Sequence, residues 1–251
     1  MEEKLIEFNN KLRNMSGTLL DNMPEPKDKK EALLMFALAK TDKTHNAILT
    51  LCRDGMGEDA AILCRSIFEM LINVEYILAD TTTSRVDRYF DYDWVLRKEM
   101  YEASLHTSLA KSAINERQIN PPPHFLDEDL KVVIENADRA QSQHKYEPRG
   151  WSNKNLWEMA TSVGRKDIYN TVYKLQCGLA HSSPRTMNDY FKFKDGSVIL
   201  DAGPSKNYVN EVLSASFNFY FLLIDCFNDY FKKGKDEELR TLEEEFVQVV
   251  K

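Results

Sequence analysis

Residues 58–79, EDAAILCRSIFEMLINVEYILA, decide the fold, because their apolar side chains recur with the spacing of an α-helix. At about 100° per residue, the apolar positions cover most of the helix circumference. They are Ile62, Leu63, Ile67, Phe68, Met70, Leu71, Ile72, Val74, Ile77 and Leu78. A helix that is apolar nearly all round is typically central in a bundle. The stretch therefore predicts a buried helix around which the other elements pack.

One narrow polar stripe interrupts this apolar surface, and it contains Glu58, Arg65, Glu69, Asn73 and Tyr76. Arg65 and Glu69 are four residues apart, a spacing at which their side chains can pair on a helix. One interpretation is a solvent-facing strip with a weak surface ion pair. The other is a cleft-lining polar site, where an unpaired charge would be costly and must meet a partner or a ligand.

The rest of the chain reads as further helices separated by proline and glycine. We expect helices over residues 1–23, 28–54, 84–114, 127–146, 166–181, 205–231 and 236–250, with a short segment around residue 157. Residues 191–194 and 197–200 flank Asp195-Gly196, a pattern typical of a β-hairpin. The sequence predicts an all-α helical bundle of about seven to nine helices with one small β-hairpin near residues 190–201.

A chain of 251 residues can bury a core large enough to fold without a metal or a disulfide. No repeat or low-complexity linker divides it. We expect a single helical domain over residues 1–251, with the N-terminal helix (1–27) at its periphery and a charged helix over residues 232–251.

The composition excludes several classes of protein. Forty acidic residues outnumber 33 basic ones, so the net charge of −7 argues against a dedicated DNA-binding surface or an anionic-membrane binder. The longest nearly apolar stretch, residues 217–227, is too short to cross a bilayer. Zinc-type cysteine clusters, phosphate loops and hydrolase motifs are absent from the sequence. We expect a cytoplasmic protein with no metal, no cofactor and no membrane partner.

The segment CGLAHSSPR, residues 177–185, is the second unusual place. His181 falls at the expected end of a helix and is followed by Ser182, Ser183 and Arg185, which could hold an anion. The alternative is a histidine that caps the helix, followed by a serine turn.

The two segments together resemble a bacterial family, the domain of unknown function 5677. The resemblance covers roughly residues 40–230 and is carried by RSIFE (65–69), by IN (72–73) and YI (76–77), by Tyr169 to Tyr173, and by AHSSP (180–184). It implies that Arg65, Glu69, Tyr76 and His181 carry shared function, without implying a particular activity.

The chain is also similar to the helical HEPN superfamily, whose ribonucleases use an arginine followed four to six residues later by histidine. One match is Arg139-Ala-Gln-Ser-Gln-His144, on an expected helix. A second, Arg117 to His124, crosses a proline loop and cannot be the helical motif.

Two hypotheses follow. In the first, the chain is a metal-independent ribonuclease in bacterial stress or phage defence, with RNA as its partner. Arg65 would stabilise a phosphate, His181 would act as acid or base, and Glu69 would orient Arg65. In the second, which we rank slightly higher, the chain is a non-catalytic helical module in a homodimer, again in bacterial stress or phage defence. Its Arg/Glu/His cluster then binds a small anion or mediates a protein interaction.

Overall fold

The computed structural model describes residues 1–105, 130–148 and 150–251, and these form two compact units. The first unit contains residues 1–79 and 156–251, and the second contains residues 80–155. Within the described ranges, no helix combines the length and the apolar character needed to span a membrane.

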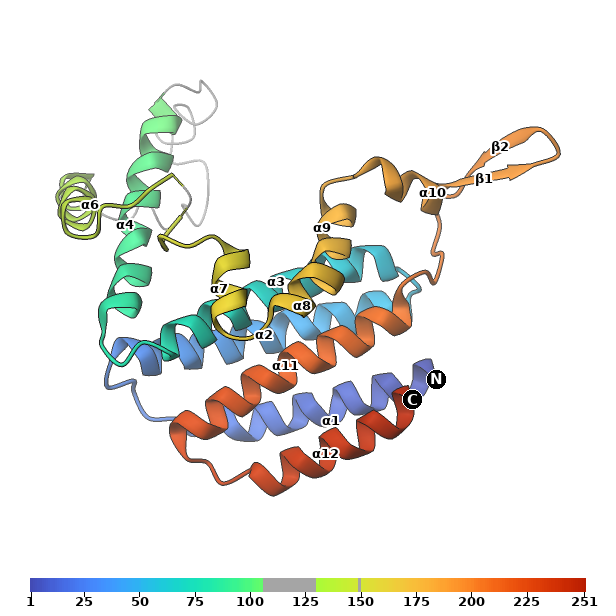
Figure 1. The fold of residues 1–251 in the computed structure, drawn as a ribbon, viewed down its shortest axis with the longest axis horizontal. Helices are drawn as coiled ribbons and strands as arrows, with labels where there is room; N and C mark the ends of the chain where they lie inside the picture. Colours follow the sequence, from blue (N-terminus) through green and yellow to red (C-terminus); the bar gives the residue numbers. More distant parts are fainter. Residues whose placement is uncertain (106–129, 149) are drawn as a thin grey trace. The chain divides into compact units, whose positions relative to one another are not determined.

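The first unit is built from helices and one hairpin (Figure 1). Its long helices are α1 (Glu2–Leu20), α2 (Lys29–Arg53), α3 (Gly57–Leu78), α11 (Val209–Phe231) and α12 (Asp236–Val250). Its shorter elements are α7 (Leu156–Ser162), α8 (Lys166–Ile168), a π-helical segment (Tyr169–Tyr173), α9 (Lys174–Ala180), a 3₁₀ turn (Pro184–Thr186) and α10 (Met187–Tyr190). The predicted all-α bundle with a small hairpin is confirmed.

Helix α3 is the central element of this unit, as its sequence predicts. It packs against α2, α11, α9 and α7. The ring of Phe68 is fully buried and lies 5.1 Å from that of Phe219 on α11 and 5.2 Å from that of Tyr173. Burial of such aromatic side chains is a large favourable term in folding. Phe68 therefore joins α3 to α11 and to the π-helical segment.

Helix α2 begins where the sequence places its N-cap. The carboxylate of Asp28 accepts a hydrogen bond from the backbone N–H of Glu31, and the Glu31 carboxylate accepts one from the N–H of Lys27. This arrangement satisfies backbone donors that the first turn of a helix leaves free. At the other end, α2 stops at Arg53, before Gly55 takes a positive φ of 76°.

Helices α1 and α12 both pack against α11. Phe8 of α1 and Phe246 of α12 meet Phe217 of α11, and the rings of Phe217 and Phe246 are stacked with centroids 3.7 Å apart. The charged helix α12 thus still has a buried apolar side, formed by Leu239, Leu242 and Phe246.

The hairpin consists of β1 (Phe191–Lys194) and β2 (Ser197–Leu200), which pair antiparallel with Phe191 opposite Leu200 and Phe193 opposite Val198. Asp195 and Gly196 both have positive φ, 50° and 75°, as a two-residue type I′ turn requires. The predicted Asp-Gly hairpin is confirmed.

The second unit contains α4 (Ser84–Leu105) and α6 (Leu130–His144), which pack against each other. The guanidinium of Arg88 donates hydrogen bonds to the carbonyls of His144 and Trp151 and to the side chain of Asn153. These bonds fix the chain after α6 to the start of α4. The predicted helices extended to residue 114 and began at residue 127, and those ends lie outside the described residues.

Candidate functional site

Arg65 and Glu69 form the predicted ion pair on α3. The Arg65 Nε lies 2.7 Å from Glu69 Oε1, and the side chains are 23% and 37% exposed. The stripe is therefore neither a free surface strip nor fully buried. It lies at the edge of the core, where α9 packs against α3.

Tyr173, at the end of the π-helical segment, contacts this ion pair. Its hydroxyl donates to the same oxygen of Glu69, over 2.8 Å, so Oε1 accepts two hydrogen bonds. Burial raises the pKa of Tyr173, and the adjacent Glu69 carboxylate raises it further. Tyr173 is therefore a neutral donor that fixes Glu69. π-Helical turns occur frequently at functional sites.

His181 completes the cluster from the end of α9. Its Nε2 lies 3.1 Å from Arg65 Nη1. Because a guanidinium has only donors, Nε2 accepts this hydrogen bond, and the imidazole in this arrangement carries its proton on Nδ1. The structure thus brings together Arg65, Glu69 and His181, although Arg65 and His181 are 116 positions apart in the sequence.

The turn after α9 has the geometry of a Schellman C-cap. The N–H of Ser182 bonds to the carbonyl of Leu179, and the N–H of Ser183 bonds to that of Gly178. Ser182 adopts a positive φ of 48°, where glycine is usual. The C-cap and the serine turn of the alternative interpretation are therefore both present. The same turn also positions His181 beside Arg65.

Electrostatics keep Arg65 charged. Burial opposes the charge, but hydrogen bonding to Glu69 and the contact with Tyr173 outweigh it and raise the pKa of the guanidinium. The Arg65 guanidinium carbon also lies 5.3 Å from the centroid of the Tyr173 ring. The cluster thus holds a fixed cation beside an imidazole.

The other residues predicted near His181 line two pockets next to the cluster. Ser182 lines a pocket of about 280 Å³ with Glu58 and Ile62 of α3. Ser183 and Arg185 line a second pocket, of about 340 Å³, together with Lys174 of α9. Sequence reasoning missed Lys174.

Asn73 and Tyr76 continue the stripe along α3, where Asn73 is half-buried and Tyr76 is buried. Between them, Glu75 accepts hydrogen bonds from Nε and Nη2 of Arg165, the shortest at 2.7 Å. This forked ion pair, also missed from the sequence, fixes the chain that leads into α8.

The secondary candidates do not form a site together. His144 Nε2 pairs with Asp91 Oδ2 at 2.9 Å, whereas Arg139 is exposed and makes no ion pair with the described residues. They are five positions apart on α6, so they do not share a helix face. The second match, Arg117 to His124, lies outside the described residues.

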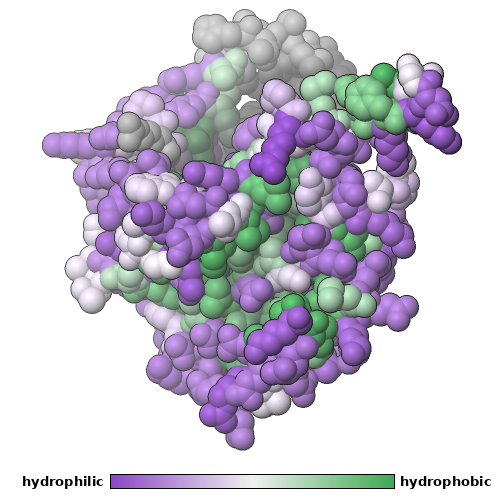
Figure 2. All heavy atoms as spheres, turned by 45° about the vertical axis from the view of Figure 1, so that its right-hand side comes forward, coloured by the Kyte–Doolittle hydropathy of each residue, from purple (hydrophilic) through white to green (hydrophobic). Residues whose placement is uncertain are grey.

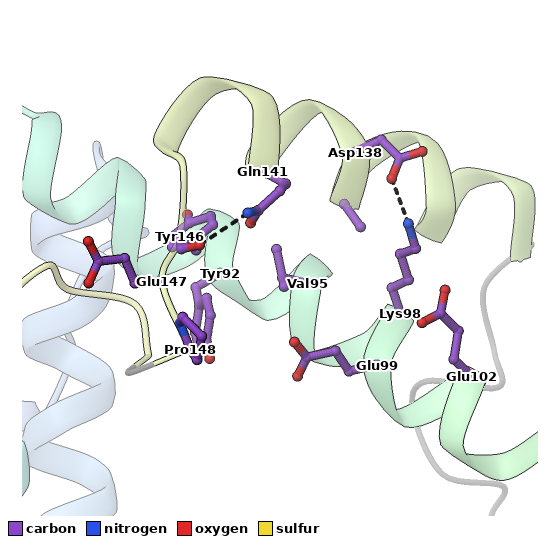
Figure 3. A pocket seen from close by; sticks show the side chains of 11 residues that line it. Tyr92, Val95, Lys98, Glu99, Glu102, Asp138, Gln141, Tyr146, Glu147 and Pro148 are labelled. Atoms are coloured by element: carbon purple, nitrogen blue, oxygen red, sulfur yellow. Dashed lines mark hydrogen bonds and ion pairs between the residues drawn. The ribbon is translucent and has the colours of Figure 1, made fainter.

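The second unit has a pocket of its own, of about 440 Å³, between α4 and α6 (Figure 3). Its cation, Lys98, is paired with Asp138 at 2.7 Å, while Glu99, Glu102 and Glu147 also line it. This excess of carboxylates disfavours a phosphate ligand. Across the described ranges, we find no group of three or more metal-ligating side chains.

Fold and cluster together define an all-α protein with a polar Arg-Glu-Tyr-His cluster at its surface. The chain belongs to the family described as "Family of unknown function (DUF5677)", which matches residues 31–198. This match contains both α3 and the His181 loop, as the resemblance predicted. No curated protein and no solved structure matches the chain. The resemblance to HEPN proteins stays a prediction.

Proposed function

We propose that the chain is a helical binding module that holds an anionic group, a phosphate or a carboxylate, at the end of α9. The observation that carries this proposal is the Arg65 guanidinium, fixed by Glu69 and His181 yet still 23% exposed. Two of its five N–H donors are used in these bonds, which leaves others for a ligand. A pre-positioned guanidinium matches the forked geometry of phosphate and carboxylate oxygens.

The charges around the His181 loop support an anion. Lys174 and Arg185 line the same 340 Å³ pocket, and neither forms an ion pair with the described part of the chain. The one carboxylate in that pocket, Asp189, accepts hydrogen bonds from the hydroxyl of Tyr208. Lys174 and Arg185 thus supply two positive charges to this pocket, although the whole chain is acidic.

Titration of the protein with inorganic phosphate, followed by nuclear magnetic resonance of the histidine side chains, tests this proposal. We expect saturable shifts of the His181 resonances. Arg65→Lys keeps the charge but loses the fork, so the Kd should rise by about tenfold or more. Arg97→Lys is a matched control, because Arg97 pairs with Asp93 at the same 2.7 Å and is 25% exposed.

Two results would contradict anion binding at this cluster. In one, phosphate shifts no His181 resonance at millimolar concentration. In the other, Arg65→Lys and Arg97→Lys bind phosphate equally well, which would place the anion elsewhere on the chain.

The 3.1 Å contact between Arg65 and His181 favours a second candidate, a metal-independent ribonuclease. Arg65 would move from His181 to a phosphate oxygen, which would free Nε2 to accept the proton of a 2′-hydroxyl as its oxygen attacks phosphorus. The 5′-oxygen would leave and take a proton from solvent. Glu69 would keep its hydrogen bond to Arg65 Nε during this movement, and Tyr173 would hold the Glu69 carboxylate.

Incubation of RNA with the protein in EDTA distinguishes the two candidates. A ribonuclease cleaves the RNA, and His181→Gln abolishes cleavage while the thermal unfolding of the helices stays unchanged. Intact RNA, combined with phosphate binding that depends on Arg65, would exclude the ribonuclease and leave the binding module.

A further inference from the structure

The β-hairpin exposes more apolar surface than a two-stranded element can stabilise by itself. The exposed fractions are 76% for Phe193, 69% for Leu200 and 55% for Val198. The strand register places these side chains on one face, with Phe191 opposite Leu200 and Phe193 opposite Val198. An isolated two-stranded hairpin is marginal in water, and contiguous exposed apolar patches mark interaction sites.

This face continues into a hollow at the base of the same hairpin. The hollow is the 280 Å³ pocket, and Ile62, Leu179, Met187, Tyr190 and Phe191 supply its apolar lining. Met187 and Tyr190 are themselves 49% and 46% exposed. Figure 2, in which the projecting hairpin lies at the upper right, shows hydrophobic surface gathered on this arm. The chain therefore carries a protruding apolar side chain, Phe193, and an apolar hollow.

The two parts carry opposite charges. Lys194, directly after Phe193, lies on the opposite face of β1, is exposed and forms no ion pair with the described residues. Glu58 borders the hollow, and Asp59 and Asp189 line the groove that shares Glu58 and Tyr190 with it. Burial and then the negative charge of these three carboxylates raise the pKa of Tyr190. The hollow is thus surrounded by negative charge, which attracts a cationic arm.

We propose that the hairpin of one copy docks into the hollow of a second copy, with Phe193 in the apolar pocket and Lys194, on the opposite face of the arm, attracted by the negative charge around the hollow. Because each copy has one arm and one hollow, the exchange can be reciprocal and closes as a two-fold dimer. Two strand edges, β1 and β2, remain open for backbone pairing with the partner. The proposal is independent of anion binding at Arg65.

Sedimentation equilibrium of the full chain, without added phosphate, tests the dimer. Wild type should form dimers at micromolar concentration. Phe193→Ser should raise the dimer Kd by about tenfold or more, because it removes the buried aromatic anchor from both contacts. Phe36→Ser on α2 is the control, since Phe36 is 51% exposed and lies outside the proposed surface.

Complementation between two variants distinguishes arm exchange from other modes of association. Met187→Glu should block the hollow and leave the arm intact, whereas Phe193→Ser removes the arm residue and leaves the hollow. Each variant alone should be monomeric, and an equimolar mixture should form heterodimers through the one intact contact. Unchanged circular dichroism melts show that both variants fold.

Three results would overturn this proposal. The first is a wild-type chain that stays monomeric at about 200 µM, a concentration well above the Kd of specific complexes. The second is a Phe193→Ser variant whose dimer Kd equals that of wild type. The third is a mixture of the two variants without heterodimers.

Discussion

His45 is a fully buried titratable side chain that the candidate site does not use. It is fully buried, and its Nε2 lies 2.7 Å from Asn9 Oδ1. The Asn9 amide nitrogen donates to the carbonyls of Leu5 and Leu213, so its oxygen accepts and His45 Nε2 must carry the proton. Nδ1 has no partner among the described residues. A single asparagine and histidine thus tie α1, α2 and α11 together.

The stability of the chain should therefore fall in mild acid. Burial, followed by the positive charge of Arg13, lowers the pKa of His45 from 6.5 to about 3, against the opposing charge of Asp42. Above pH 6.5 both folded and unfolded chains hold His45 neutral. Below it the unfolded chain binds a proton that the folded chain excludes. From about pH 7.5 to about pH 5.5, the free energy of unfolding should drop by about 1.4 kcal/mol through this group.

Urea unfolding of wild type and His45→Gln at both pH values measures this contribution. The variant should lose about 1.4 kcal/mol less than wild type over the interval. His181→Gln is the control, because His181 is exposed. Equal pH dependence in wild type and His45→Gln would show that His45 does not control the acid response.

At the scale of elements, α11 starts where it does because α3 begins with a glycine. A Cβ on Gly57 would lie 1.8 Å from the carbonyl oxygen of Asn207 and 2.8 Å from the backbone nitrogen of Val209. The chain enters α11 through Lys206 and Tyr208, both with a φ of 61°. Only a residue without a side chain lets these two helix starts approach so closely.

Gly57→Ala should consequently destabilise the chain by about 3 kcal/mol or more, since the contacted atoms belong to the backbone and cannot move aside cheaply. Gly17→Ala on α1 is the matched control. No atom lies within 4 Å of a Cβ added there, and alanine should stabilise the helix by about 0.5–1 kcal/mol. Thermal unfolding measures both changes: the Tm should fall for Gly57→Ala and rise for Gly17→Ala. A Gly57→Ala variant as stable as wild type would disprove this packing.

Local sequence predicts most elements of this chain but not the assembly of its site. Apolar periodicity and Pro or Gly boundaries placed α2, α3, α11 and the hairpin, because these depend on local spacing. The π-helical segment carries no breaker residue, so residues 166–181 read as one helix. Neither Tyr173 nor Lys174 was predicted as a site residue, although Tyr173 belongs to the segment that carries the family resemblance. The Arg65–His181 contact depends on how α9 packs against α3, which no spacing along the chain encodes.

At the scale of the whole molecule, burial is graded from the centre of the first unit to its hairpin. Helices α3 and α11 contribute 13 buried residues each, whereas the strand residues β1–β2 are almost all exposed. Free energies of local opening follow burial and contact density. The hairpin is therefore among the least protected of the described elements of a single copy, although it carries the proposed docking arm.

Hydrogen exchange at a series of protein concentrations should show how protection differs between the core helices and the hairpin. It should also show that this difference shrinks when the dimer forms. In dilute solution, the backbone amides of α3 and α11 should exchange only by global unfolding, and those of β1 and β2 should exchange about a hundredfold faster or more. As concentration rises through the dimer Kd, only the amides of the hairpin and of Met187–Tyr190 should slow, because docking removes them from water. Hairpin amides that stay fast while sedimentation shows a dimer would place the interface on another surface. Slow hairpin exchange at every concentration would mean that a single copy already stabilises the arm, and the physical reason for docking would disappear.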